Sequence, residues 1–577
     1  MLEPAQVLAR YPAHRWTLGS LLASRAGSAG QREFLVFGER SWTYSQTLLE
    51  VDRSAAMLQA RGIGAGQRVG VMSLNHPSTV FVFFALARLG AVMVPVNPEF
   101  RAEEARYVLS HAEVSGVVCS PTALETVRGA LAPTPLRPWL MLNEPPEGDD
   151  AASRDAAAAP ELFDAAVQRA NAGAPAAQPL GSAAPAATEQ ADAPCVFIYT
   201  SGTTGFPKGV MHSQRNVVLA GEGFVQRMYL QPDDRLMCIL PMFHINALFY
   251  SLAGALAAGA ALVLISRFSA SRFWVDVARF RATEVNTMAA VSTILMRRPR
   301  DEFVPGHALR KIYGAPFTAE IYRVFNEEFG VPSLIEGYGM SEIPGALNNP
   351  FLGPHKIGSM GQPSRHPDPA LRLAELRVVD DAGAELPDGQ TGELVVKTPM
   401  LMKGYYRDPQ QTEAAFRDGW FLTGDLAWRD NDGYFWFVAR KKDIIRRRGE
   451  NISGAELDRI VELHPDVVQA AAIPVPNELG DDEILVAAIL KPGAALSEQG
   501  LADWVRERLA AAKMPRYVVF VDALPQTPTH RVAKFKMRAD KTLQLRAVDL
   551  TAAGAAARGS AAAAAPTAAA KPGARSA

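Results

Sequence analysis

Twelve residues near the middle of the chain combine glycines, hydroxyl side chains and one cation in a pattern suited to phosphate. The segment is Tyr199-Thr-Ser-Gly-Thr-Thr-Gly-Phe-Pro-Lys-Gly-Val210, which holds four Ser/Thr hydroxyls, three glycines and one lysine. Glycine lets the backbone approach a ligand closely, and exposed N–H groups in such a turn form a concave anion site. Lys208 adds a point charge. The segment therefore predicts a loop that binds polyphosphate.

The loop differs from the pattern of P-loop nucleoside triphosphatases, in which Gly-Lys-Ser/Thr leads into a helix. Here Pro207 precedes the lysine, Gly209 follows it, and Val210-Met211 favours an extended strand. An ordinary surface loop rich in Gly, Ser and Thr would have the same composition. The assignment therefore depends on residues elsewhere in the chain.

The composition narrows the class of protein. The chain has 577 residues, which predicts two or more domains, and its 59 Lys and Arg balance 60 Asp and Glu. This balance argues against a main role in binding nucleic acid or an anionic membrane surface. Cys119, Cys195 and Cys238 lie far apart in apolar surroundings, which indicates buried thiols in a reducing, cytoplasmic compartment. Met1–Arg15 lacks an apolar core, so no secretion signal is predicted.

One uncharged run, Ala247–Ile265, is close to the length of a membrane span. Its many alanines and its glycines favour a different interpretation. A helix over Ala247–Ala258, a break at Gly259 and a buried strand over Ala261–Ile265 account for the run. We therefore expect no transmembrane segment.

Short apolar segments alternate with amphipathic segments along the first part of the chain. Val69–Met72, Ala91–Val96 and Gly116–Cys119 predict strands, whereas Leu48–Arg61 and Ser78–Leu89 have the apolar spacing of helices. Such alternation predicts a parallel sheet that is covered on both faces.

The pattern divides the chain into domains of the α/β class. Residues 1–439 predict a large N-terminal domain of parallel α/β subdomains, with a small β-barrel-like unit over 374–402. Residues 440–547 predict a small, mobile α+β C-terminal domain.

Two segments rich in alanine have the composition of disordered chain. An insert over about 143–193 predicts a surface excursion with one short helix at Leu162–Arg169. The tail over 548–577 is expected to be disordered. Neither segment carries residues suited to chemistry.

Further motifs follow the phosphate loop and together resemble the adenylate-forming superfamily, which includes acyl-CoA synthetases, peptide-synthetase adenylation domains and firefly luciferase. The resemblance covers about residues 15 to 545. Its motifs occur in the order of the superfamily and are Pro241-Met-Phe-His-Ile-Asn246, Tyr313-Gly-Ala-Pro316, Glu336-Gly-Tyr-Gly-Met-Ser-Glu342, Trp420-Phe-Leu-Thr-Gly-Asp425, Arg440-Lys-Lys-Asp-Ile-Ile445 and Gly449-Glu-Asn-Ile452.

The resemblance implies a site for ATP, Mg²⁺ and coenzyme A. A carboxylate that attacks the α-phosphate of ATP brings two anions together, so the site must supply cations and oriented donors. Glu342 is implied as the Mg²⁺ ligand, since this cation favours a carboxylate and phosphate oxygens. The residues implied to bind the β- and γ-phosphates lie in the loop and are Thr200, Ser201, Gly202, Thr203, Thr204, Gly205 and Lys208.

The same resemblance implies an adenosine pocket. Tyr338 offers a flat face to adenine, Asp425 is placed like the superfamily's acceptor for the ribose hydroxyls, and Arg440 like its nucleotide-contacting arginine. The remaining residues implied to line the nucleotide are Gly314, Ala315, Pro316, Glu336, Gly337, Gly339, Met340 and Ser341.

Other positions are implied to serve the acid and CoA. His244 corresponds to a histidine that borders and gates the acyl pocket, near Asn246. Lys442 and Asp443 correspond to the pivot about which the small domain rotates between the two half-reactions. The residues implied to line the pantetheine channel are Gly449, Glu450 and Asn451. His212, also in apolar surroundings, has no predicted role.

The last motif of the superfamily is altered in this chain. It usually reads Pro-x-Thr-x-x-Gly-Lys, and its lysine contacts the substrate carboxylate and phosphate, but here it is Pro525-Gln-Thr-Pro-Thr-His-Arg531. Arg531 keeps the charge yet is larger, planar and bidentate. Either Arg531 takes the role of that lysine, or Lys534 or Lys536 does.

The expected activity is that of an ATP-dependent carboxylic acid–CoA ligase, which forms an acyl-adenylate and then an acyl-CoA. Arg297-Arg298-Pro-Arg300 and the Gly-Glu-Asn-Ile loop look more like fatty acid and carnitine-type CoA ligases than like amino-acid-activating domains. Two alternatives stay open, namely an acyl-AMP ligase that loads a carrier protein and an impaired homologue that binds nucleotide or acyl-CoA. The altered last motif is the only support for the impaired homologue.

Overall fold

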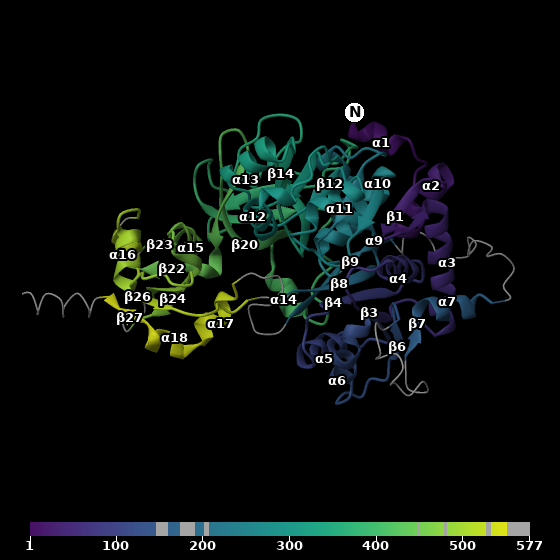
Figure 1. The fold of residues 1–577 in the computed structure, drawn as a ribbon, viewed down its shortest axis with the longest axis horizontal. Coiled ribbons are helices and arrows are strands. Elements are labelled where there is room, and N and C mark those ends of the chain that lie inside the picture. Colours follow the sequence, from purple (N-terminus) through teal and green to yellow (C-terminus); the bar gives the residue numbers. More distant parts are fainter. Residues whose placement is uncertain are drawn as a thin grey trace, which may run out of the picture. The chain divides into compact units, whose positions relative to one another are not determined.

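The structure is a computed structural model in which the chain forms two compact units (Figure 1). The first consists of Met1–Thr423 and Trp428–Phe437, and the second of Gly424–Ala427 and the described residues from Val438 onward. The described residues are 1–145, 160–172, 191–200, 207–447, 450–477, 482–509, 511–526 and 532–550, without the side chains of Lys442, Arg446, Glu450 and Asn451.

A seven-stranded sheet in the first unit ends in the two strands that flank the phosphate loop. Its order is β7-β6-β5-β3-β4-β8-β9, and its neighbours are parallel except for β8 and β9. The parallel sheet predicted from the alternation of strands and helices is confirmed. The strands are β3 (Arg68–Met72), β4 (Val92–Val96), β5 (Gly116–Cys119), β6 (Trp139–Leu142), β7 (Glu161–Leu162), β8 (Pro194–Thr200) and β9 (Lys208–Ser213).

A nine-stranded sheet supplies the other segments with predicted site residues. Its order is β16-β15-β14-β13-β12-β10-β11-β1-β2, with a parallel centre and antiparallel strands at both edges. The strands are β1 (Glu33–Phe37), β2 (Arg40–Thr43), β10 (Arg235–Cys238), β11 (Ala261–Leu264), β12 (Glu284–Asn286), β13 (Lys311–Gly314), β14 (Ser333–Met340), β15 (Ile343–Asn348) and β16 (Gln362–Pro363).

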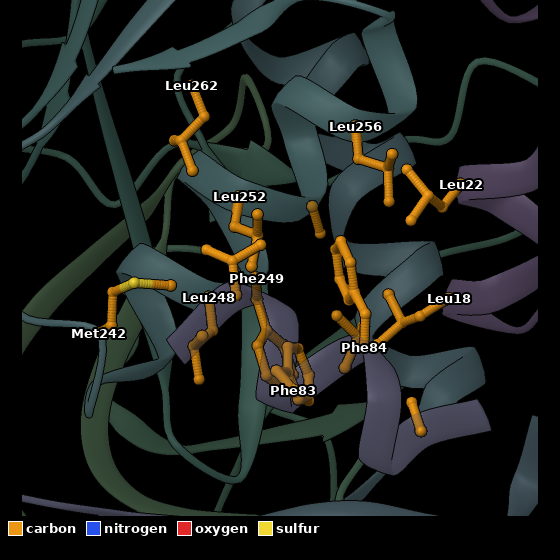
Figure 2. Close-up of a cluster of buried hydrophobic side chains, with 14 of the residues drawn as sticks. Leu18, Leu22, Phe83, Phe84, Met242, Leu248, Phe249, Leu252, Leu256 and Leu262 are labelled. Atoms are coloured by element: carbon orange, nitrogen blue, oxygen red, sulfur yellow. The ribbon is translucent and has the colours of Figure 1, made fainter. Parts of the chain in front are cut away.

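The uncharged run from Ala247 forms the centre of the largest hydrophobic core. It comprises a π-helix (Asn246–Leu252), α10 (Ala253–Ala258), a left-handed Gly259 at φ 69° and β11, so the interpretation as helix, break and strand is confirmed. A helix that is apolar on all sides belongs in a protein interior. Figure 2 shows its side chains directed toward those of α2 and α4. Among the described helices, none combines the length and apolarity needed to cross a bilayer.

The helices of the first unit lie between these strands along the chain. Within the Ala-rich insert, the predicted short helix is confirmed, and residues 146–159 and 173–190 lie outside the described residues. The helices are α1 (Pro4–Ala9), α2 (Leu18–Ala29), α3 (Tyr44–Ala60), α4 (Pro77–Arg88), α5 (Ala102–His111), α6 (Leu124–Leu131), α7 (Phe163–Ala170), α9 (Gln214–Met228), α11 (Phe273–Arg279), α12 (Ala289–Arg297), α13 (Ala319–Arg323) and α14 (Pro409–Ala414).

The predicted small β unit is an antiparallel sheet that curls into a half-barrel. Its path is β17-β18-β20-β19, and β21 pairs with β20. The sheet extends beyond the predicted range of 374–402, because β19, β20 and β21 also belong to it. The bounds are β17 (Glu375–Val379), β18 (Gly392–Lys397), β19 (Phe416–Arg417), β20 (Trp420–Arg429) and β21 (Phe435–Arg440).

The second unit is α+β, as predicted. A hairpin of β22 and β23 precedes a four-stranded sheet of order β24-β25-β26-β27. The first residues of the tail predicted over 548–577 belong to this sheet, because Val548 pairs with Val518, and residues 551–577 lie outside the described residues. The elements are β22 (Ile444–Arg447), β23 (Glu450–Ser453), α15 (Gly454–Glu462), β24 (Val467–Pro476), β25 (Asp482–Leu490), α16 (Glu498–Arg506), β26 (Tyr517–Phe520), α17 (Lys534–Ala539), α18 (Lys541–Arg546) and β27 (Val548–Asp549).

Candidate active site

The two strands of a hairpin hold the ends of the phosphate loop. Thr200 ends β8 and pairs with Lys208, the first residue of β9. The chain leaves the loop as a strand and not as a helix, as the sequence predicted. The loop residues between these ends, Ser201, Gly202, Thr203, Thr204 and Gly205, lie outside the described residues, so their contacts with phosphate stay predictions.

A later segment, Met400–Tyr406, lies along β9. The Met211 amide donates to the Gly404 carbonyl at 3.1 Å, and the Tyr406 amide donates to the Gly209 carbonyl at 2.8 Å. The Lys403 amide donates to the Met211 carbonyl at 2.8 Å. This pairing brings the segment that follows β18 in the chain to β9, the strand that carries Lys208.

Glu342 lies in the tight turn between β14 and β15. β14 continues to Met340, which pairs with Ile343, so only Ser341 and Glu342 form the turn. The Glu342 side chain is buried, and its Oε1 accepts a hydrogen bond of 2.9 Å from the Tyr405 hydroxyl. The Met402 amide donates to the Glu342 carbonyl at 2.9 Å.

Tyr405 joins the predicted phosphate lysine to the predicted metal ligand. The Lys208 Nζ lies 4.7 Å from the centre of the Tyr405 ring, while the hydroxyl of the same ring contacts Glu342. Sequence reasoning did not find Tyr405. The only signal is a glycine followed by two tyrosines after the predicted β unit, and it indicates no chemistry without the long-range pairing to β9.

Glu336 was predicted to line the nucleotide, and its carboxylate is buried in contacts with the protein. Its Oε1 accepts from the Phe317 amide at 2.9 Å, and its Oε2 from the Gly358 amide at 3.0 Å and the Tyr322 hydroxyl at 3.3 Å. Burial raises the pKa of this carboxyl group. Glu336 therefore fixes the loop after Gly314 relative to β14.

The predicted adenine walls are adjacent because β13 and β14 are parallel neighbours. Gly314 is in register with Glu336, so the Gly314-Ala315-Pro316 loop and the segment after Glu336 leave the same edge of the sheet. A Cβ atom on Gly337 would lie only 2.4 Å from the Tyr313 hydroxyl oxygen, so this position requires glycine. Tyr338 is half-buried in β14, and its stacking on adenine stays a prediction.

The His244 turn follows β10 at the same edge of the sheet. The His244 amide donates to the Pro241 carbonyl at 3.0 Å, and its ring centre lies 4.4 Å from that of Phe243. Asn246 Oδ1 accepts a hydrogen bond of 2.8 Å from Asn286. The same Asn286 amide donates to the Ser251 hydroxyl at 3.0 Å, and the acyl pocket near His244 stays a prediction.

His212 is fully buried beside the Glu342 turn. Its Nε2 donates to the Ser341 carbonyl at 2.6 Å. Burial lowers the pKa of His212 to about 4. The neutral ring thus contributes to the position of the turn, a role that the sequence did not indicate.

Asp425 and Arg440 form an ion pair in the second unit. The Arg440 Nε lies 2.8 Å from Oδ1 of Asp425, whose side chain is 0% exposed. Both were predicted to contact the nucleotide, and the structure brings them together. The remaining predicted residues of this unit are not described, either as side chains (Lys442, Glu450, Asn451) or entirely (Gly449, Arg531).

One residue of the predicted pivot and one lysine that follows the altered last motif each form an ion pair. Asp443, next to Lys442, pairs with Arg538 at 2.8 Å. Lys534, one alternative to Arg531, pairs with Asp458 at 2.5 Å, and Lys536 is exposed.

Comparison with known proteins identifies the family of the chain. Residues 22–406 match the family described as AMP-binding enzyme, and residues 456–531 match the AMP-binding enzyme C-terminal domain. The sulfoacetate–CoA ligase of Cupriavidus necator is 32% identical over 90% of this chain and 97% of its own length. The indoleacetate–CoA ligase of Aromatoleum aromaticum is 30% identical, with coverage of 90% and 97%.

Solved structures show the same fold. The ATP-bound structure of MatB from Rhodopseudomonas palustris has a TM-score of 0.75 at 27% identity and covers 90% of this chain and 98% of its own. A benzoate CoA ligase from Burkholderia xenovorans has a TM-score of 0.75 at 23% identity, with coverage of 90% and 99%. The chain therefore belongs to the AMP-binding enzyme family, in its branch of AMP-forming acid–CoA ligases.

Proposed function

We propose that the chain is an ATP- and Mg²⁺-dependent carboxylic acid–CoA ligase. The observation that supports this most directly is the contact of Tyr405 with both Lys208 and Glu342. It places a cation and a buried carboxylate together at the strand that leaves the phosphate loop. Membership of the family supports the same activity.

The proposed reaction has two steps. An oxygen of the substrate carboxylate attacks the α-phosphorus of ATP, and the bond to the β,γ-pyrophosphate breaks to give an acyl-adenylate. The thiolate of CoA then attacks the acyl carbon, and AMP leaves. Because the first step brings anions together, Lys208 and the loop donors offset their repulsion by holding the β- and γ-phosphates.

The residues around Glu342 fit Mg²⁺. This cation usually takes one or two carboxylates and completes its shell with phosphate oxygens and water. No group of three His, Cys, Asp or Glu side chains in the described part of the chain forms a metal site by itself. A single buried carboxylate beside a phosphate loop is the donor set expected for a nucleotide-bound ion, which when bound would offset phosphate charge. Glu342 would hold it, and Tyr405 orients Glu342.

The acid is a small-molecule carboxylate whose identity the relatives do not specify. They are named for sulfoacetate, indoleacetate and crotonobetaine or carnitine, which are chemically different acids, at similar identity. The fatty-acid assignment suggested by the sequence therefore gains no support from them. We propose that the acid lies between the His244–Asn246 turn and the segment Gly314–Gly339.

The test is to measure release of pyrophosphate and AMP over a panel of carboxylic acids, with and without CoA. We expect pyrophosphate release to require an acid and sustained AMP release to require CoA. Turnover that never responds to CoA but loads a carrier protein would favour an acyl-AMP ligase. Binding of ATP without turnover of any acid would favour an impaired homologue.

A further inference from the structure

Tyr405 contacts both charged groups on which the proposed function rests. Its side chain is 8% exposed, its hydroxyl lies 2.9 Å from Glu342 Oε1, and its ring centre lies 4.7 Å from Lys208 Nζ. One side chain thus satisfies an anion through its polar end and a cation through its aromatic face.

Backbone contacts place Tyr405 independently of both partners. Its amide donates to the Thr412 hydroxyl at 2.9 Å, and Tyr405 forms a β-bridge with Val210. Gly404 has φ 120°, and a Cβ atom there would lie 3.0 Å from a side-chain carbon of Thr412. The backbone of Tyr405 is therefore held by the chain on either side, so its place does not depend only on the charges that its side chain contacts.

The contacts of Tyr405 matter most when no nucleotide is bound, because the Lys208 ammonium and the Glu342 carboxylate then have neither phosphate nor metal ion as a partner. An ammonium group and a carboxylate close together in a buried site attract each other strongly. If they formed a direct pair, ATP would have to break it before Lys208 met phosphate and Glu342 met a metal ion. The phenol instead gives each charge an uncharged partner, the hydroxyl for the carboxylate and the ring face for the ammonium.

We propose that Tyr405 is a positioning residue that spaces the Lys208 ammonium from the Glu342 carboxylate and so prepares the site for the metal–nucleotide complex. The hydroxyl orients the carboxylate, and the ring face holds the ammonium. The two contacts are predicted to affect different steps of binding. Loss of the hydroxyl weakens the response to Mg²⁺, and loss of the ring also weakens the binding of nucleotide itself.

The test compares Tyr405→Phe and Tyr405→Leu with the wild type, using α,β-methylene-ATP as the probe. Calorimetry gives its Kd in EDTA and over a Mg²⁺ series, with neither acid nor CoA present. Tyr405→Phe should leave the Kd in EDTA within about twofold and raise the half-saturating Mg²⁺ concentration about tenfold, since a hydrogen bond to a charged group is lost. Tyr405→Leu should raise both quantities.

The neighbouring Tyr406→Phe is the matched control. Its ring packs against Phe197 with a centre distance of 4.6 Å, so its hydroxyl should affect neither quantity. In a Glu342→Gln background, Tyr405→Phe should cause no further change in the half-saturating Mg²⁺ concentration. This comparison tests the role of the Tyr405 hydroxyl even if Tyr405→Leu does not fold.

The outcomes separate this inference from the proposed function. An unchanged Mg²⁺ response in Tyr405→Phe, with a wild type that binds the probe, overturns the role of Tyr405 alone. The role of Tyr405 is also overturned if Tyr405→Phe shifts the half-saturating Mg²⁺ concentration as much in the Glu342→Gln background as in the wild type. A wild type that does not bind the probe with Mg²⁺ overturns the proposed function and the inference together.

Discussion

His212 and Ser341, 129 residues apart in the sequence, are joined by a hydrogen bond of 2.6 Å from the imidazole Nε2 to the Ser341 carbonyl oxygen. Because Nε2 donates, the neutral ring accepts at Nδ1, where the Asn216 amide nitrogen lies at 3.3 Å. Asn216 also donates to the Met400 carbonyl at 2.6 Å. The imidazole thus connects the start of α9 to the turn that carries Glu342.

The buried imidazole predicts a loss of stability in acid. Burial lowers the pKa of His212 from 6.5 to about 4, so below pH 6.5 the unfolded chain binds a proton that the folded chain does not. This contribution to stability is complete above pH 6.5 and is lost as the pH falls to about 4, by about 3 kcal/mol in total. Urea unfolding of the wild type and His212→Gln over this range should show a flatter profile in the variant.

His76 supplies the matched control, since burial also lowers its pKa to about 4 and it is not part of the predicted site. His76→Gln should flatten the profile as well, but only His212→Gln should raise the KM for ATP. Parallel stability profiles for wild type and His212→Gln would contradict the buried neutral ring.

The phosphate lysine and the metal ligand are expected to be essential for the first half-reaction. Lys208→Ala and Glu342→Ala should each lower acid-dependent exchange of pyrophosphate into ATP by about 100-fold or more, since each removes charge stabilisation from the transition state. Glu103→Ala, at an exposed ion pair of α5, should leave the exchange unchanged. Full activity in Glu342→Ala would rule out this residue as the metal ligand.

Arg531 and Lys534 are predicted to have separable roles. Arg531→Ala should slow adenylate formation but leave thioester formation from a supplied acyl-adenylate intact. Lys534→Ala should lower stability, because it leaves the carboxylate of Asp458 without the ammonium at 2.5 Å. Single-turnover assays of each step, with a thermal melt, distinguish the two. If Arg531→Ala adenylates at the wild-type rate, the role assigned to Arg531 is wrong.

The ion pair of Asp425 and Arg440 should stabilise the second unit and bind ribose through the carboxylate. Arg440→Met leaves a carboxylate that is 0% exposed without its guanidinium, and should lower the free energy of unfolding by about 3 kcal/mol. Arg372→Met, which breaks an exposed pair with Glu375, should cost less than about 1 kcal/mol. Equal losses measured by urea unfolding would contradict the importance of burial.

The sequence predicted well what depends on local pattern. Apolar runs between amphipathic segments indicated the parallel sheets, and Gly259 indicated the break before β11, because its position needs positive φ. The strand after Lys208 followed from Pro207 and Gly209, which are unsuited to a helix start of the P-loop type.

What the sequence could not show depends on contacts between distant segments. Tyr405 lies at the site only because Met211 pairs with Gly404, and no local sequence pattern indicates that pairing. That Glu336 lines the nucleotide stays a prediction, and its motif did not indicate that amides from two other loops would hold its carboxylate. Nor does any local pattern indicate that Leu35 of β1 pairs with Leu262 of β11, more than 200 residues later in the chain.

The late return of Met400–Tyr406 to β9 has a consequence for synthesis on the ribosome. Domains generally fold from the N-terminus as the chain emerges, and every strand of the two large sheets precedes Met400. Until Tyr406 has emerged, β9 has β8 as a neighbour but lacks its contacts with Met400–Tyr406, and Glu342 lacks the phenol that orients it. If Tyr405 positions these two groups as proposed, we expect the nascent chain to bind the metal–nucleotide complex only after this late segment has emerged.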